Sequence, residues 1–216
     1  MPNCPLCLNS KTFLYYHISI KNLDRDYFKC PICSFVFVPS YDHLSNYDQM
    51  SRYLNHRNDP QDLHYRNFLT PIKTAMLPYL KPGQNGLDFG SGPGPTLSVM
   101  FQEEGYKMET FDLFFNNDEQ TLKHKYDFIV STETVEHFDN PMKEFVLLSK
   151  LLKSKGTLGI MTSILYRHIK FSDWYYILDP THVGFYSPET FEYIGNLFKY
   201  TLYTPTDNVY IFTKNV

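Results

Sequence analysis

Apolar and polar residues alternate along the second half of the chain as short apolar runs followed by stretches of helical spacing. The pattern predicts strands near 107–111, 126–130, 157–161, 200–204 and 209–213, and helices near 95–104, 141–152 and 188–198. Asn140 and Ser187 each precede a proline that opens a helix, and both residue types cap helix N-termini. Strands and helices in this order predict an α/β fold with a largely parallel sheet.

The first 80 residues follow a different pattern. Strand-like stretches are expected near 12–18, 26–29 and 34–38, and helical stretches near 44–56 and 60–80. Pro71 is expected to kink the second helix. We therefore expect a small unit at 1–40, a helical linker or lid at 41–80, and the α/β domain at 81–216.

The composition is that of a folded protein with many aromatic residues. Of 216 residues, 43% are hydrophobic and 20% charged, which excludes wholesale disorder, and the 17% aromatic share indicates rings that line a pocket or an interface. The net charge of −3 disfavours a nucleic-acid partner. The chain has no apolar run of the ~20 residues that a membrane span needs, and no secretory signal. We expect a soluble cytoplasmic protein with no membrane partner.

All four cysteines lie in two Cys-Pro-x-Cys pairs, Cys4 with Cys7 and Cys30 with Cys33. Such pairs supply the four thiolates of a tetrahedral zinc site. The alternatives are disulfides or unrelated thiols, and the missing secretory signal disfavours disulfides. The segment resembles a zinc ribbon of the rubredoxin-knuckle type, with Leu8 and Ser34 in place of the usual knuckle glycines. Four thiolates leave no open position, so the expected zinc is structural.

A glycine-rich turn follows the first predicted strand of the α/β domain. The segment reads Leu87-Asp88-Phe89-Gly90-Ser91-Gly92-Pro93-Gly94-Pro95-Thr96. Pro95 replaces the third glycine of a dinucleotide fingerprint, which disfavours a nicotinamide cofactor. The segment resembles motif I of class I S-adenosylmethionine (SAM) methyltransferases. The resemblance implies that Gly90, Ser91, Gly92 and Gly94 approach SAM, with Asp88 toward its ammonium group.

The resemblance covers residues 65–216 and implies a Rossmann-like, seven-stranded sheet with one antiparallel strand. Asp112 ends the second strand and is expected to accept both ribose hydroxyls of SAM, the alternative being a solvated loop residue. Leu113 and Thr132 stand at the same predicted sheet edge and are further expected cofactor contacts. Tyr53, His56 and Asn58 lie where the family places a helix over SAM; a solvated helix face is the alternative.

Glu133, Glu136 and His137 follow the strand at 126–130. In a helical turn the three side chains share one side, and two carboxylates with an imidazole can bind a divalent cation. The pattern looks like the Glu-x-x-Glu-His of quinone-biosynthesis O-methyltransferases and small-RNA 3′-terminal 2′-O-methyltransferases. His182 is the expected fourth ligand. Without a metal, His137 or His182 would act as general base, with Glu136 beside it.

The whole chain looks like a class I SAM methyltransferase with an N-terminal zinc ribbon. The expected function is methyl transfer from SAM to a small-molecule acceptor, with oxygen as the nucleophile and a second divalent cation as one alternative. An aromatic segment at 171–176 is a candidate wall for a planar acceptor. The rival function is a non-catalytic module that docks on a protein or RNA partner.

Overall fold

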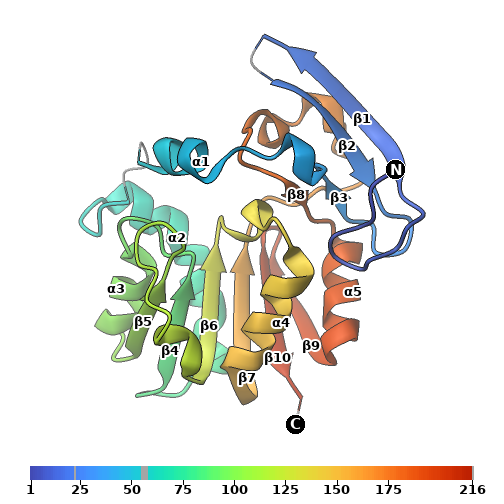
Figure 1. Ribbon diagram of the computed structural model, residues 1–216. Helices are drawn as coiled ribbons and strands as arrows, with labels where there is room; N and C mark the ends of the chain where they lie inside the picture. The colour runs from blue at the N-terminus through green and yellow to red at the C-terminus, as the bar shows by residue number, and fades with distance from the viewer. Residues whose placement is uncertain (22, 55–57, 216) are drawn as a thin grey trace.

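A six-stranded sheet with the order β5-β4-β6-β7-β10-β9 forms the centre of the computed structural model, which describes residues 1–21, 23–54 and 58–215 (Figure 1). Its strands are β4 (Asn85–Phe89), β5 (Lys107–Phe111), β6 (Tyr126–Thr132), β7 (Leu152–Met161), β9 (Tyr200–Thr206) and β10 (Val209–Lys214). Strands β5, β4, β6 and β7 are parallel, whereas β10 runs antiparallel to both neighbours. The predicted α/β fold is confirmed.

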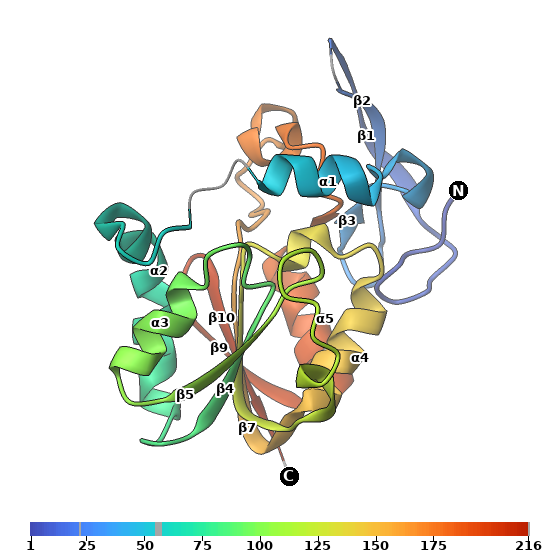
Figure 2. The same ribbon diagram turned by 60° about the vertical axis from the view of Figure 1, so that its left-hand side comes forward.

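Two helices cover each face of this sheet (Figure 2). Helices α2 (Leu63–Met76) and α3 (Thr96–Glu103) pack with Phe128 and Val130 in one buried cluster. Helices α4 (Pro141–Leu151) and α5 (Pro188–Phe198) pack with Ile129 in another. Neighbouring β6 residues thus face opposite layers, which explains why a strand buried on both sides is apolar throughout.

The expected helix caps are formed. The Asn140 side chain accepts a hydrogen bond from the Lys143 amide, and Ser187 forms a reciprocal capping box with Thr190. Pro71 lies inside α2 without ending it. A short α1 (Asn46–Tyr53), capped by Ser45, lies across the carboxyl edge of the sheet (Figures 1 and 2). None of the helices in the described residues is long and apolar enough to span a membrane.

The prediction of a seventh strand is wrong for the described residues, because the central sheet ends at β5. Residues 112–125 between β5 and β6 hold only a loop, an isolated bridge from Asp112 to Asn116, and a 3₁₀ turn at Thr121–Lys123. Parallel strands need a crossover of about a dozen residues in each direction. This connection is therefore too short for a helix, another edge strand and a return. The chain there forms loops above the sheet edge instead.

A second sheet joins the N-terminal segment to the C-terminal half. Its order is β1-β2-β3-β8, formed by β1 (Phe13–Ile20), β2 (Leu23–Lys29), β3 (Val36–Phe37) and β8 (Gly184–Phe185). Val36 pairs with Phe185 and Phe37 with Gly184. Cys4, Leu6 and Phe35 also share a buried cluster with residues of α4 and α5. The boundaries at residues 40 and 80 stay a prediction.

Candidate active site

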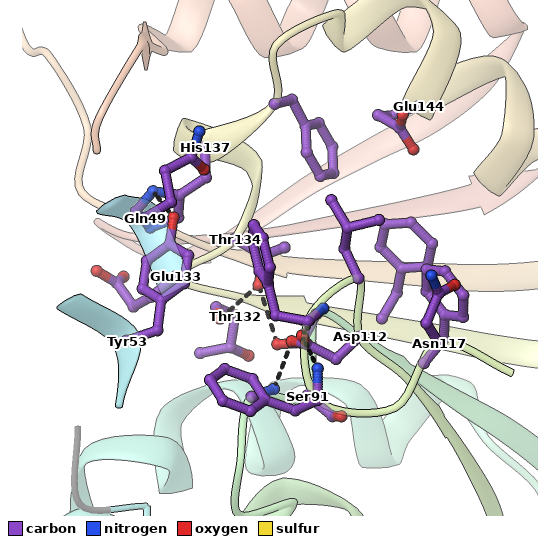
Figure 3. A pocket seen from close by; sticks show the side chains of 18 of the residues that line it. Gln49, Tyr53, Ser91, Asp112, Asn117, Thr132, Glu133, Thr134, His137 and Glu144 are labelled. Atoms are coloured by element: carbon purple, nitrogen blue, oxygen red, sulfur yellow. Dashed lines mark hydrogen bonds between the residues drawn. The ribbon is translucent and has the colours of Figure 1, made fainter. Parts of the chain in front are cut away.

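A cavity of about 1010 Å³ opens at the carboxyl ends of β4, β5 and β6. Open α/β sheets bind ligands at this edge. In Figure 3, Ser91 and Asp112 lie between a group containing Tyr53, Glu133 and His137 on one side and Asn117 on the other. The expected site residues that line the cavity are Tyr53, Asn58, Gly90, Ser91, Gly92, Asp112, Leu113, Thr132, Glu133, Glu136, His137 and His182. His56 lies outside the described residues.

The glycine-rich turn after β4 needs its glycines for different reasons. Gly90 and Gly92 have φ values of +80° and +64°, which L side chains rarely adopt. A Cβ on Gly90 would lie 2.2 Å from Thr134 Cγ2. A Cβ on Gly94 would lie 1.9 Å from the Asn58 carbonyl oxygen, so a glycine is needed there for Asn58 to pack on the turn. Gly94 itself does not line the cavity.

Asp112 is held in place by backbone amides. One carboxylate oxygen accepts from the Gly92 amide at 2.8 Å, and the other accepts from Phe114 and Phe115 at 2.9 and 3.1 Å. A carboxylate has about four lone-pair positions. Three of these lone-pair positions on Asp112 are therefore in use. About one position is left for a ligand, whereas two ribose hydroxyls would need two.

Asp88 does not lie in the cavity. It is buried behind the glycine turn, where the Ser98 hydroxyl donates to its carboxylate at 3.0 Å. Burial raises the pKa of Asp88 to about 7. The expected direct contact with an ammonium group is therefore not formed, because this side chain faces α3.

Asp88→Asn is expected to change how stability depends on pH. The folded protein holds the Asp88 proton up to about pH 7, whereas the unfolded chain releases it near 3.8, so folding stability falls as pH rises between these values. An amide removes this titration and keeps the Ser98 hydrogen bond. Relative to wild type, the variant should gain about 2–3 kcal/mol between pH 5 and pH 8 in urea unfolding. The exposed Asp118→Asn is the matched control, and parallel curves for Asp88→Asn and wild type would contradict the prediction.

Thr132, at the end of β6, has a buried hydroxyl with no hydrogen-bond partner. Tyr53 reaches the cavity from α1, with its hydroxyl 3.1 Å from His137 Nδ1. Burial raises the pKa of Tyr53 well above its ordinary value. The unpaired Thr132 hydroxyl in the cavity wall indicates a ligand group that completes it.

Glu136, His137 and His182 converge, with one ligand atom from each lying within 4.8 Å of the other two. Glu136 is completely buried, and one of its carboxylate oxygens accepts from the Thr162 hydroxyl at 3.0 Å. The other oxygen has no hydrogen-bond partner and lies 3.8 Å from His137 Nε2. A buried carboxylate oxygen without a partner is costly unless a ligand or cation completes it.

Backbone carbonyls fix both imidazole rings. His137 Nδ1 lies 3.0 Å from the Thr181 carbonyl oxygen, and His182 Nδ1 lies 2.8 Å from that of Tyr176. A carbonyl oxygen only accepts, so each Nδ1 carries a proton and Nε2 is the ring nitrogen left for another partner. Burial lowers the pKa of His182, which favours the neutral form of that ring. Carbonyls that hold the Nδ1 protons are typical of metal-binding histidines.

Glu133 is not part of this convergent group. It has a left-handed φ of +46°, and its carboxylate accepts from the Tyr176 hydroxyl at 3.4 Å. Burial, with the Glu136 carboxylate nearby, raises the pKa of Glu133 to about 9. The structure thus brings together three of the four expected ligands. The helical turn assumed for 133–137 begins only at Val135, as a 3₁₀ turn, and so directs Glu133 elsewhere.

Sequence reasoning missed Thr162 and Tyr176, whose hydroxyls lie 3.0 Å apart beside Glu136 and Glu133. Thr162 directly follows β7, at the sheet edge where ligand-binding residues gather. This position after a predicted strand could have identified Thr162 as a site residue from the sequence. Tyr176 ends the aromatic segment considered as an acceptor wall, but its role depends on contacts that the segment alone does not indicate.

The four cysteines form one cluster, in which Cys30 and Cys33 come from the turn between β2 and β3. The Sγ atoms of Cys4 and Cys33 are 3.6 Å apart, those of Cys7 and Cys30 are 3.4 Å apart, and all four lie within 4.8 Å of one another. None forms a disulfide. Leu8 and Ser34 have φ values of +61° and +59°, so both knuckle turns keep the glycine-type conformation without glycine.

Similarity to known proteins agrees with this geometry. A family model described as "Methyltransferase domain" matches residues 62–202. A search of curated protein sequences gave no match. Because the family model spans most of the chain, the chain belongs to the methyltransferase domain family.

Solved structures support the fold assignment. A SAM-dependent methyltransferase from Archaeoglobus fulgidus is 23% identical, with a TM-score of 0.51 over 73% of this chain and 75% of that one. Phosphoethanolamine N-methyltransferase 2 from Haemonchus contortus, bound to SAM, is 19% identical with a TM-score of 0.51; the match covers 68% of this chain but only 39% of that protein. The 1,6-didemethyltoxoflavin-N1-methyltransferase of Burkholderia thailandensis is 12% identical, with a TM-score of 0.53 over 84% of this chain and 96% of that one.

Gly92→Val is expected to lower SAM affinity at least about 100-fold, because a β-branched side chain opposes the positive φ and projects toward the cavity beside Asn58. Gly83→Val is the matched control, since Gly83 has a φ of +77° with no atom within 4 Å of an added Cβ. Calorimetric titration with SAM measures both variants. Equal affinities for the two would place the cofactor elsewhere.

Proposed function

We propose that this protein transfers the methyl group of SAM to a hydroxyl oxygen of a small-molecule acceptor, with a divalent cation at Glu136, His137 and His182. The observation that carries the proposal is the convergence of three donor groups on the SAM cavity, with two Nε2 atoms and one unpartnered carboxylate oxygen. One carboxylate and two imidazoles suit a transition metal such as Zn²⁺ or Mn²⁺. A cation bound there would lower the pKa of an acceptor hydroxyl and orient it.

The residues of this chain carry the remaining tasks. The turn at Gly90–Gly92 and the fixed Asp112 carboxylate line the cavity and would hold the cofactor there. Thr162 orients the Glu136 carboxylate, and the Thr181 and Tyr176 carbonyls orient the two imidazoles. The acceptor oxygen would then lie on the His137 side of the cofactor, where Tyr53 of α1 helps to exclude water. Positioning of this kind is the main requirement of methyl transfer, because the sulfonium is already activated.

We also propose that Cys4, Cys7, Cys30 and Cys33 bind one structural zinc ion. A tetrahedral site with Zn–S bonds of about 2.3 Å has sulfur–sulfur edges of about 3.8 Å. The sulfur–sulfur separations of 3.4 and 3.6 Å in the structure are close to this value. Four protein ligands leave no position for a substrate, so this site supports folding and not the reaction.

The assay that tests the function uses zinc-loaded protein, SAM labelled in the methyl group, and panels of hydroxylated and amine acceptors. The amines are included because two of the structurally similar proteins are named N-methyltransferases. We expect labelled methyl ethers, and loss of activity in a chelator too weak to remove the cysteine-bound zinc. Labelled amines only would overturn the choice of oxygen. Full activity in chelator would overturn the catalytic cation and leave His137 and His182 as candidate general bases.

A further inference from the structure

The cysteine ribbon is the N-terminal unit at 1–40, which carries the four cysteines and strands β1 to β3. Arg25 projects from its strand β2 into the C-terminal half of the molecule. Its side chain is only 4% exposed and donates at 3.0 Å to each of three backbone carbonyls, those of Ile177, Asp179 and Pro180. Its Nε also donates to the Tyr27 hydroxyl at 2.9 Å, which in turn donates to the Ile177 carbonyl at 2.9 Å. A residue of the N-terminal segment therefore holds a loop more than 150 residues away.

The loop that Arg25 holds is the one that orients both histidines. The Tyr176 carbonyl accepts from His182, and the Thr181 carbonyl accepts from His137. The three carbonyls bound by Arg25 lie between these two positions in the sequence. The His182 amide also donates to the Asp179 carbonyl at 3.1 Å. A shift of this loop would therefore move both imidazoles at once.

The energetics support a positioning role. Moving a guanidinium group out of water is costly unless its donors are satisfied. Here the acceptors are neutral carbonyls and one hydroxyl, so the hydrogen bonds do not neutralise the charge. The loop consists of a short 3₁₀ turn, Tyr175–Leu178, and the residues after it, so its carbonyls need partners from outside. Arg25 supplies donors to three of them in one rigid group.

We propose that Arg25 is a positioning residue for His137 and His182, which makes the cysteine ribbon a working part of the methyl-transfer site. The proposal rests on the function proposed above for the two histidines. Arg25 does not line the cavity. It acts through the 177–180 backbone, and Tyr27 supports it with one further hydrogen bond to the same loop.

The test compares four variants of the full chain, with zinc at the four cysteines and the Glu136, His137 and His182 site cleared by a weak chelator. Arg25→Met removes all the donors, Arg25→Lys restores a cation with three donors, and Tyr27→Phe removes one hydroxyl from the network. Lys29→Met is the matched control, because Lys29 is a cation on the same strand and stacks on Tyr15 instead of reaching the loop. Zinc content and thermal unfolding establish that each variant is folded.

Arg25→Met should reduce kcat about 10–100-fold and Mn²⁺ affinity, measured by electron paramagnetic resonance, by about 10-fold, as expected when groups that orient metal ligands are removed. SAM affinity should stay within about twofold. Tyr27→Phe should give a smaller loss, Arg25→Lys should recover part of the activity, and Lys29→Met should match wild type. Equal losses of SAM affinity and kcat, or an Arg25→Met variant that is folded and fully active, would overturn the proposal.

Side-chain nitrogen NMR of the histidines separates this inference from the proposed function. In wild type, His137 and His182 should each show an Nδ1 proton in a hydrogen bond to a carbonyl. Tyr27→Phe and Arg25→Lys should shift the signals of both rings together, even where Arg25→Met does not fold. Unchanged signals in both conservative variants would overturn the positioning role. A wild type with the expected histidine signals but no methyl transfer and no Mn²⁺ binding would instead overturn the proposed function.

Discussion

Alanine at Glu136, His137 or His182 is expected to reduce methyl transfer by about two to four orders of magnitude. The affinity for SAM should change less than about threefold, because these side chains form a group separate from the glycine turn and Asp112. Each side chain supplies one of three convergent ligand atoms, so its removal leaves the acceptor oxygen poorly held. Single-turnover assays with labelled SAM and calorimetric SAM titration measure the two quantities separately.

His17→Ala is the control for this series, since His17 is an exposed imidazole on ribbon strand β1. It should keep wild-type activity. Glu133→Gln should also retain more activity than any of the three alanine variants, because Glu133 pairs with Tyr176 outside the convergent group. Parallel losses of SAM affinity and turnover across the series would contradict a site that acts on the acceptor.

Cys30→Ser, or removal of zinc by a strong chelator, is expected to unfold the N-terminal ribbon and to abolish methyl transfer with it. Structural zinc binding in small domains is worth about 10–16 kcal/mol, as much as the whole stability of a typical domain of about 5–15 kcal/mol. Cys30 is completely buried, and the ribbon pairs with β8 through β3. Loss of the ribbon therefore removes a sheet neighbour of the segment that follows His182. Zinc analysis measures the loss of the metal, circular dichroism the unfolding of the ribbon, and the methyl-transfer assay the loss of activity.

Ser34→Gly is the matched control beside Cys33. Ser34 has a φ of +59°, a conformation that glycine adopts more easily, so this variant should bind zinc normally and be as stable as wild type or slightly more so. A Cys30→Ser protein that lacks zinc but is folded and active would contradict both the structural zinc and the coupling of the ribbon to the active site.

Most elements of the central sheet could be predicted from the sequence because their signals are local. The helix expected at 188–198 is α5, Pro188–Phe198, and its capping box involves residues only three apart. The strand expected at 107–111 is β5. The glycine turn and the two cysteine pairs were equally accessible, since each requires particular residues at short spacing. Periodicity, caps and tight turns depend on neighbours in the chain, which a single sequence displays.

The seven-stranded sheet was wrong because the family resemblance supplied a strand that the short connection between β5 and β6 cannot form. The predicted roles of two acids also depended on side-chain direction. Asp88 faces Ser98 behind the turn, and Glu133 leaves β6 with a positive φ and faces Tyr176. Neither direction follows from the spacing of the residues.

The sequence by itself determined the family of this protein, the glycine turn that is expected to approach SAM and the four cysteines that gather at one site. Only the tertiary structure decided which acids and imidazoles meet. His137 and His182 are oriented by carbonyls of one loop, and that loop is held by Arg25, whose partner Pro180 is 155 residues away. Contacts over such separations form when β3 pairs with β8 and the buried clusters close, so they depend on the packing of the whole chain and not on any local pattern.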